Sequence, residues 1–90
     1  MSVKVHIHPY LKHLAENNDF VTAEGKTIGE CLEEVAGKYP ELDEWFFNKE
    51  RGLNPMFEVY LNMGSTIPEG LAMPVKSGDE INLIITIAGG

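Results

Sequence analysis

The sequence has little of several features that would otherwise suggest a function. Its 90 residues include a single cysteine, Cys31, so no disulfide can form within the chain. Basic residues number 7 against 14 acidic ones, and the formal charge of −7 opposes a phosphate backbone. No apolar stretch approaches the roughly 18 residues of a membrane span, and the N-terminus alternates polar and apolar residues, unlike a signal peptide. We therefore expect a cytoplasmic protein with neither nucleic acid nor membrane as a partner.

Catalytic motifs are also missing from the sequence. It has no glycine-rich phosphate loop, no nucleophile elbow and no paired-carboxylate motif. The hydrophobic content of 43% is sufficient for one small core. We expect residues 1–90 to form a single domain that is not an enzyme by itself, with a flexible C-terminal tail at 88–90.

The N-terminal third predicts two strands. Val3, Val5 and Ile7 alternate with polar residues, which is typical of a half-buried strand, and Pro9 stops the pattern. A second short strand is predicted around residues 20–21, between two clusters of turn-forming residues, and could return antiparallel to the first.

One helix is predicted after the second strand. Thr27 is a good N-cap, and Glu30, three residues later, could complete a capping box. Pro40 disfavours the helical conformation at Tyr39, so we expect the helix to end near Lys38 or Tyr39. The apolar positions at helical spacing are Ile28, Leu32, Val35 and Tyr39.

The second half of the sequence predicts an aromatic-rich insertion at 41–55 followed by two further strands. The third strand alternates over 57–61, and a turn follows at Met63-Gly64. The last strand follows the turn at 76–80 and covers the apolar run 81–88. This order, with the first and last strands side by side and the helix across one face, predicts an α+β protein with a β-grasp fold and a mixed sheet.

The most specific pattern lies at the end of the sequence, where the apolar run leads directly into Gly89 and Gly90. With the other motifs of the chain, this ending resembles the ubiquitin-like sulfur carriers of the MoaD and ThiS group. The other motifs are Thr27-Ile28, Tyr39-Pro40-Glu41-Leu42, Leu61-Asn62 and Ser77-Gly78-Asp79-Glu80.

The resemblance implies a function for the terminal residues. In this family a partner related to ubiquitin-activating enzymes uses ATP to adenylate the terminal glycine, which becomes a thiocarboxylate and gives its sulfur to an acceptor enzyme. Carried over here, Gly90 bears the sulfur, and Gly89 and Ala88 belong to the flexible tail. The chain itself then binds no cofactor, and its partners are the adenylating enzyme, a sulfur donor and the acceptor enzyme.

Two features separate branches of that family. The segment Ile85-Thr86-Ile87 lacks the proline that often precedes the terminal glycines of molybdopterin-type carriers. The segment 45–55 and Gly70-Leu71-Ala72 are similar to carriers that supply sulfide for cysteine or homocysteine synthesis. The molybdopterin synthase small subunit stays open as the other carrier type, and a modifier joined to lysines through Gly90 is the alternative function.

Glycine suits this chemistry for physical reasons. A carboxylate is a poor electrophile, so it must be activated as a mixed anhydride before a sulfur nucleophile can displace AMP. Gly90 has no Cβ to obstruct the attack, and a Gly-Gly step adopts backbone conformations closed to other residues. Such a tail can enter the active site of another protein.

The remaining candidate residues have simpler interpretations. His6 and His8 share a strand face, but two histidines without a third ligand are usually solvent-facing, so we expect no metal site. Cys31 borders the apolar face of the helix and is interpreted as a packing residue. Ile84, Tyr60 and Phe57, or Phe46 in place of Phe57, could form an exposed apolar patch that binds a partner.

Overall fold

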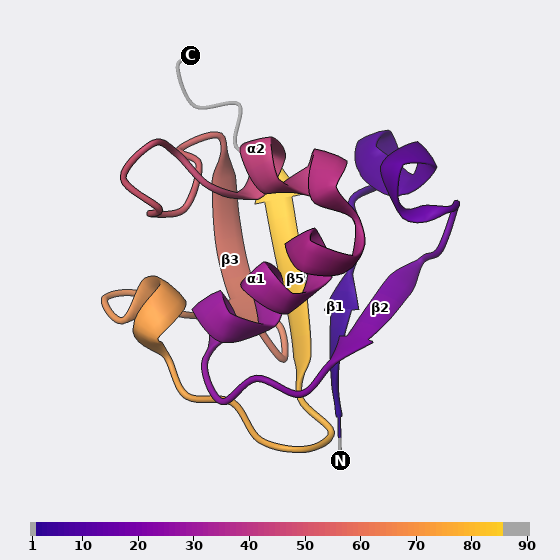
Figure 1. Ribbon diagram of the computed structural model, residues 1–90. Coiled ribbons are helices and arrows are strands. Elements are labelled where there is room, and N and C mark those ends of the chain that lie inside the picture. Colours follow the sequence, from indigo (N-terminus) through magenta and orange to yellow (C-terminus); the bar gives the residue numbers. More distant parts are fainter. Residues whose placement is uncertain (1, 86–90) are drawn as a thin grey trace.

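A five-stranded mixed sheet forms one layer of the molecule, and helix α1 crosses it to form the other (Figure 1). The structure is a computed structural model that describes residues 2–85. The strands are β1 (Val3–His6), β2 (Phe20–Ala23), β3 (Phe57–Leu61), β4 (Gly64–Ser65) and β5 (Glu80–Ile85). The helices are α1 (Ile28–Lys38), α2 (Asp43–Phe46) and the 3₁₀ helices η1 (Pro9–Ala15), η2 (Pro40–Leu42) and η3 (Gly70–Ala72).

The strand order is β2-β1-β5-β3-β4, which confirms the predicted β-grasp arrangement. The first and last strands, β1 and β5, are parallel neighbours in the centre, with Val5 opposite Ile81. All other pairs are antiparallel. The described strand ends at Ile85, so the predicted extension through 86–88 lies outside the described residues.

Helix α1 begins as its sequence predicts, with one difference. The Thr27 hydroxyl accepts a hydrogen bond from the Glu30 amide at 3.1 Å. The Glu30 carboxylate, however, accepts from the Lys26 amide at 2.9 Å, one residue before the cap, so the capping box is shifted. The helix ends at Lys38, as the following proline requires.

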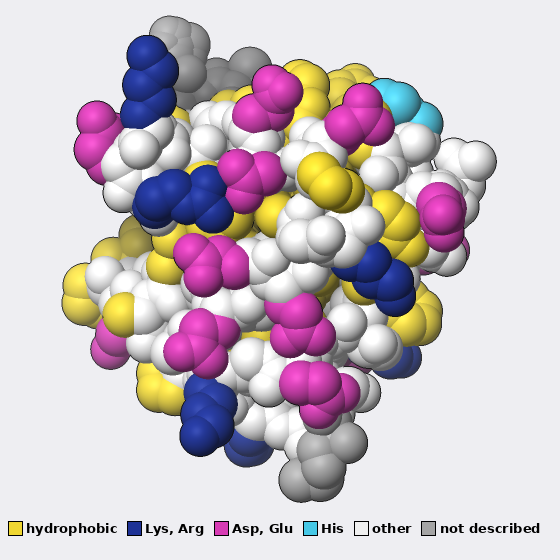
Figure 2. Space-filling model, viewed as in Figure 1, with side chains coloured by type: hydrophobic (Ala, Val, Ile, Leu, Met, Phe, Trp, Pro, Cys, Tyr) yellow, Lys and Arg dark blue, Asp and Glu magenta, His cyan; other side chains and the backbone are white. Residues whose placement is uncertain are grey.

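The core lies between α1 and the sheet. The helix buries Ile28, Cys31, Leu32, Val35 and Ala36 against the inward residues of the strands. Its exposed side carries acidic residues, which are spread over this face of the molecule (Figure 2). No helix within residues 2–85 is both long and apolar enough to cross a bilayer.

The 41–55 segment is more regular than predicted. Helices η2 and α2 lie at its start, Phe46 and Phe47 are buried as the expected aromatic anchor, and Trp45 is 39% exposed. Phe47 also forms an isolated bridge with Leu53. The segment therefore packs against the core instead of extending from it as a loose insertion.

Candidate functional site

The last described element, β5, is the central strand of the sheet and directly precedes the C-terminal residues of the sequence. Strand β5 lies between β1 and β3 and buries Ile81 and Leu83 against the helix side. Gly90, Gly89 and Ala88, which the sequence singled out, lie outside the described residues. The structure therefore describes the sheet and the strand that precede these residues, up to Ile85.

The start of β5 is held by Asp79, whose side chain is buried. Its carboxylate accepts hydrogen bonds from the Lys76 amide at 2.8 Å, the Asn62 side-chain amide at 2.9 Å and the Lys76 ammonium at 3.1 Å. Asn62 also accepts from the Glu80 amide at 2.9 Å. The hydrogen bond from Asn62 and those from Lys76 hold the pKa of Asp79 below its ordinary value of 3.8. The motif 77–80 is thus a structural clamp between the β3–β4 turn and β5.

The sheet surface opposite α1 is not covered by a helix, and we call it the open face. Alternation along the strands places Ile84, Tyr60 and Glu58 on it. Glu58 is directly opposite Ile84, and Tyr60 is opposite Asn82, so Tyr60 and Ile84 are diagonal neighbours. Ile84 is 44% exposed and Tyr60 is half-buried. The structure thus places these two side chains on one surface, and binding of a partner there stays a prediction.

Tyr60 is tied to its strand neighbour. Its hydroxyl donates to the Glu58 carboxylate at 2.9 Å, and this hydrogen bond and the nearby negative charge raise the pKa of Tyr60 above its usual 10.0. The ring is therefore neutral at physiological pH and fixed in orientation. The ring lies on the open face, diagonal to Ile84.

The expectation that Phe57 belongs to an exposed patch is wrong. Phe57 shares the inward face of β3 with Val59, and only 4% of it is exposed. Phe46, considered in its place, is 1% exposed. A strand buries alternate residues, so Phe57 cannot share a face with Tyr60, three positions later. That parity was available from the sequence.

Sequence reasoning missed two apolar side chains at the borders of the open face. Phe20 on β2 is 40% exposed and is covered on one side by the Lys4 ammonium, 4.7 Å from the ring centroid. Met63, in the β3–β4 turn, is 77% exposed, and its sulfur lies 4.0 Å from the side-chain amide nitrogen of Asn82. The period-two pattern of β2 could have identified Phe20, because Val21 and Ala23 are buried.

The histidines and the cysteine have structural contacts. His6 pairs with Glu80 at 2.8 Å, while His8 accepts a hydrogen bond from the Tyr10 amide at 3.1 Å. Within residues 2–85 no group of three potential ligands could hold a metal ion. Cys31 is fully buried and its thiol points to the Gly25 carbonyl, and burial raises its pKa. A thiol kept protonated in the core is a packing group, as predicted.

Comparison with known proteins agrees with this geometry. The model of the ThiS family matches residues 6–90. No curated protein matches the chain. Among solved structures, a chain of the BexX/CysO complex from Amycolatopsis orientalis is 28% identical, with a TM-score of 0.84 over 98% of this chain and 99% of that one.

Two other solved structures share the fold. SAMP1, the small archaeal modifier protein 1 of Methanosarcina acetivorans, is 25% identical, with a TM-score of 0.84 over 99% of this chain and 96% of that one. CysO of Mycobacterium tuberculosis is 22% identical, with a TM-score of 0.84 over 94% and 99% of the two chains. With the strand order above, these findings show that the chain belongs to the ThiS family and is a ubiquitin-like sulfur carrier with the β-grasp fold.

Proposed function

We propose that the carboxyl group of Gly90 is the site of sulfur attachment. Its carboxylate attacks the α-phosphorus of ATP in a partner enzyme, releasing pyrophosphate and forming an acyl adenylate. Hydrosulfide then attacks the carbonyl carbon, AMP leaves with its bonding electrons, and a proton is released. The product is a thiocarboxylate that carries the sulfur.

One observation supports this proposal above the others. The family match runs from residue 6 through Gly90 and so includes the two terminal glycines, which supports a role for them. Glycine leaves the carbonyl carbon unobstructed, and the preceding Gly89 permits an extended approach into an enzyme. The chain is then a co-substrate of two enzymes and not a catalyst.

The open face is the proposed contact for the adenylating enzyme. Ile84 is the exposed apolar residue on the strand that leads to the tail, and Tyr60 lies diagonally beside it. Exposed apolar side chains next to a fixed aromatic ring are typical of protein interfaces. Docking there would hold the rigid sheet while residues 86–90 reach the enzyme.

The acceptor we favour is an enzyme that uses sulfide to complete a cysteine or homocysteine skeleton. The likeness to a chain of the BexX/CysO complex, at 28% identity over nearly the whole chain, supports a CysO-type carrier over a molybdopterin-type one. Conjugation to lysines is the second candidate, and the likeness to SAMP1 at 25% identity favours it. Both functions begin with the same acyl adenylate.

Intact mass spectrometry distinguishes these functions. The full chain is incubated with the adenylating enzyme of its own cell, ATP and sulfide. A sulfur carrier gains the mass difference between sulfur and oxygen. A modifier gives lysine-linked adducts when proteins of a cell lysate are added to the same mixture. A chain lacking residues 89–90 should show neither product. An unchanged mass with an enzyme that releases pyrophosphate on a known substrate would refute the proposal.

A further inference from the structure

The outer edge of β3 is only partly covered. Strand β4 has two residues and pairs only with Tyr60 and Leu61. The first part of β3, residues 57–59, pairs with β5 on one side and with no described strand on the other. Such an edge presents backbone groups that can pair with another chain.

Two side contacts occupy part of this edge. The Phe57 amide donates to the Asn54 carbonyl at 3.0 Å, and the Thr66 hydroxyl donates to the Val59 carbonyl at 2.8 Å. Because both backbone groups of one residue point to the same side of a strand, the Val59 amide also faces outward. Between the two contacts, the Phe57 carbonyl and the Val59 amide pair with no described residue.

The Phe57 carbonyl and the Val59 amide are the two backbone groups that one residue of an added parallel strand would pair with. In parallel pairing, a single residue of the added strand donates its amide to the carbonyl before its partner and accepts from the amide after it. The partner here is Glu58, flanked by the Phe57 carbonyl and the Val59 amide. An antiparallel segment, including a second copy related by a twofold axis, could use the same two groups, but its neighbouring amide and carbonyl would face the Val59 carbonyl and the Phe57 amide, which Thr66 and Asn54 already occupy. A twofold pair centred on Glu58 would also place two carboxylates opposite each other.

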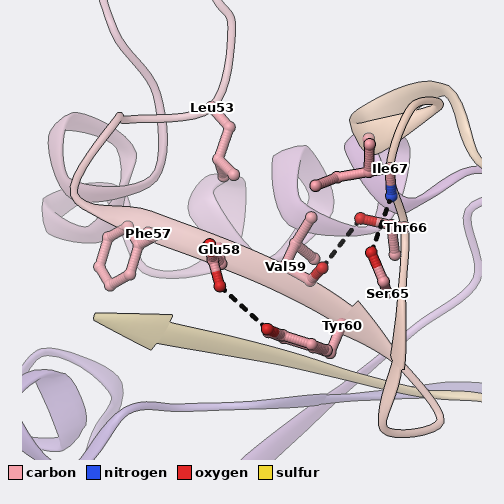
Figure 3. A pocket seen from close by; sticks show the side chains of 9 residues that line it. Leu53, Phe57, Glu58, Val59, Tyr60, Ser65, Thr66 and Ile67 are labelled. Carbon is pink, nitrogen blue, oxygen red and sulfur yellow. Dashed lines mark hydrogen bonds between the residues drawn. The ribbon is translucent and has the colours of Figure 1, made fainter. Parts of the chain in front are cut away.

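A hollow of about 210 Å³ lies beside the same edge. Figure 3 shows Leu53 and Ile67 on either side of it, with Val59 between them on the strand. Ile67 is 80% exposed, so its apolar side chain has little cover from the described residues. The hollow is large enough for an aliphatic side chain next to the backbone groups.

The strand register indicates which charge the added segment should carry opposite Glu58. The residue opposite Glu58 shares its face, and Glu58 is an exposed carboxylate on a protein of net charge −7. A lysine or arginine at that position is favoured, whereas an acidic residue is repelled. The residues on either side point to the face of Phe57 and Val59, where the hollow accepts an apolar side chain.

We propose that this edge binds an extended segment of a partner protein, parallel to β3, with a basic residue between two aliphatic ones. Backbone pairing supplies affinity, and the hollow and Glu58 supply specificity. Binding here does not require the sulfur chemistry at Gly90, although the edge shares Glu58 with the open face.

The test uses the full chain labelled with ¹⁵N and a capped five-residue peptide with lysine in the centre, valine on both sides and threonine at the ends. We expect the peptide to shift backbone amide resonances at 53–59 and 65–70, with the Val59 amide moving downfield. A spin label on the peptide N-terminus should broaden signals nearest the start of β3, as parallel binding requires. Shifts centred on β2 or Ile84, or antiparallel broadening, would overturn the proposal.

Variants test the two side-chain elements. Ile67→Ser should weaken peptide binding by roughly tenfold, because the bound peptide then no longer buries an isoleucine side chain. Tyr10→Ser removes a similarly exposed side chain away from this edge and should leave peptide binding unchanged. Glu58→Lys should reverse the preference between the lysine peptide and one with glutamate in its place. Equal affinity for both peptides in both proteins, or self-association through the edge without peptide, would refute the proposal.

Discussion

At the scale of single residues, Asp79 shows how a charge can serve the fold. It is the only buried charged side chain within residues 2–85, and its carboxylate has partners on the β3–β4 turn and on its own turn. Hydrogen bonds to a buried carboxylate are stronger than neutral ones. The motif that resembles the family therefore has a structural reason independent of function.

Asp79→Asn should destabilise the fold by about 2 kcal/mol at neutral pH, because the amide places a donor against the donors of Asn62 and Lys76. Urea denaturation followed by circular dichroism measures this difference. Glu69→Gln, at an exposed position, is the matched control and should change stability by less than about 0.5 kcal/mol. Equal stability of the Asp79 variant and the unmodified protein would contradict the clamp.

The pH dependence follows from the same contacts. The folded pKa of Asp79 lies below 3.8, so its stabilising contribution is fully present above pH 3.8 and is lost as the pH falls through the lower, folded value. We expect the stability gap between the unmodified protein and Asp79→Asn to narrow below pH 3.8. Urea titrations at a series of acidic pH values measure it; a gap that widened on acidification would have the wrong sign.

In contrast to Asp79, Gly90 is proposed to serve the chemistry and not the stability of the fold. Gly90→Ala should leave the unfolding midpoint unchanged and lower the rate of acyl adenylate formation, because a Cβ crowds the reacting carbonyl. Pyrophosphate release in the presence of the adenylating enzyme measures the rate. Gly37→Ala is the matched control, since Gly37 lies on α1 with open space around it and its change should not slow activation. Equal rates for both variants would argue against attachment at Gly90.

At the scale of elements, β3 and β5 build the proposed contact for the adenylating enzyme. Ile84→Ala should raise the KM for the carrier by about tenfold while kcat changes little, because a hot-spot side chain supplies binding energy. Steady-state pyrophosphate release measures both constants. Thr22→Ala, at an exposed position of the outer strand β2, should leave them unchanged. The interface assignment fails if the two variants behave alike.

The elements also show where sequence reasoning succeeds. Periodicity and the proline after Tyr39 predicted α1 and its end, alternation predicted β1 and β3, and the flanking turn residues predicted β2. The prediction of the capping box failed because the nearby sequence allows two hydrogen bonds. The Glu30 carboxylate could accept from the backbone amide of either Lys26 or Thr27, and in the folded turn it accepts from Lys26. Phe57 lies three positions before Tyr60, so strand parity places it on the opposite, buried face of β3.

At the scale of the whole molecule, the fold was predictable because the order of its elements allows few arrangements. Parallel pairing of β1 and β5 requires a crossover, and α1 provides it on one face. The short helices of 40–46 and the uncovered edge of β3 were not predictable, since they depend on how the loops pack. Whether 1–90 acts as one domain with a flexible tail at 88–90 stays a prediction.

Net charge gives a prediction at the same scale. A carrier of charge −7 should meet an adenylating enzyme through a basic surface. We expect kcat/KM for activation to fall as sodium chloride rises from low to physiological concentration, because salt screens the attraction during encounter. Stopped-flow measurements across a salt series test this. A rate that is independent of salt, or increases with it, would contradict the expected complementarity.

The central claim is that Gly90 carries the sulfur. After activation with ATP and heavy-isotope sulfide, trypsin should release residues 77–90, because Lys76 is the last basic residue of the chain. Tandem mass spectrometry of this peptide places the isotope directly. The account predicts one heavy sulfur on the terminal carboxyl of Gly90, and a heavy sulfur on Cys31 with an unmodified C-terminal peptide would contradict it.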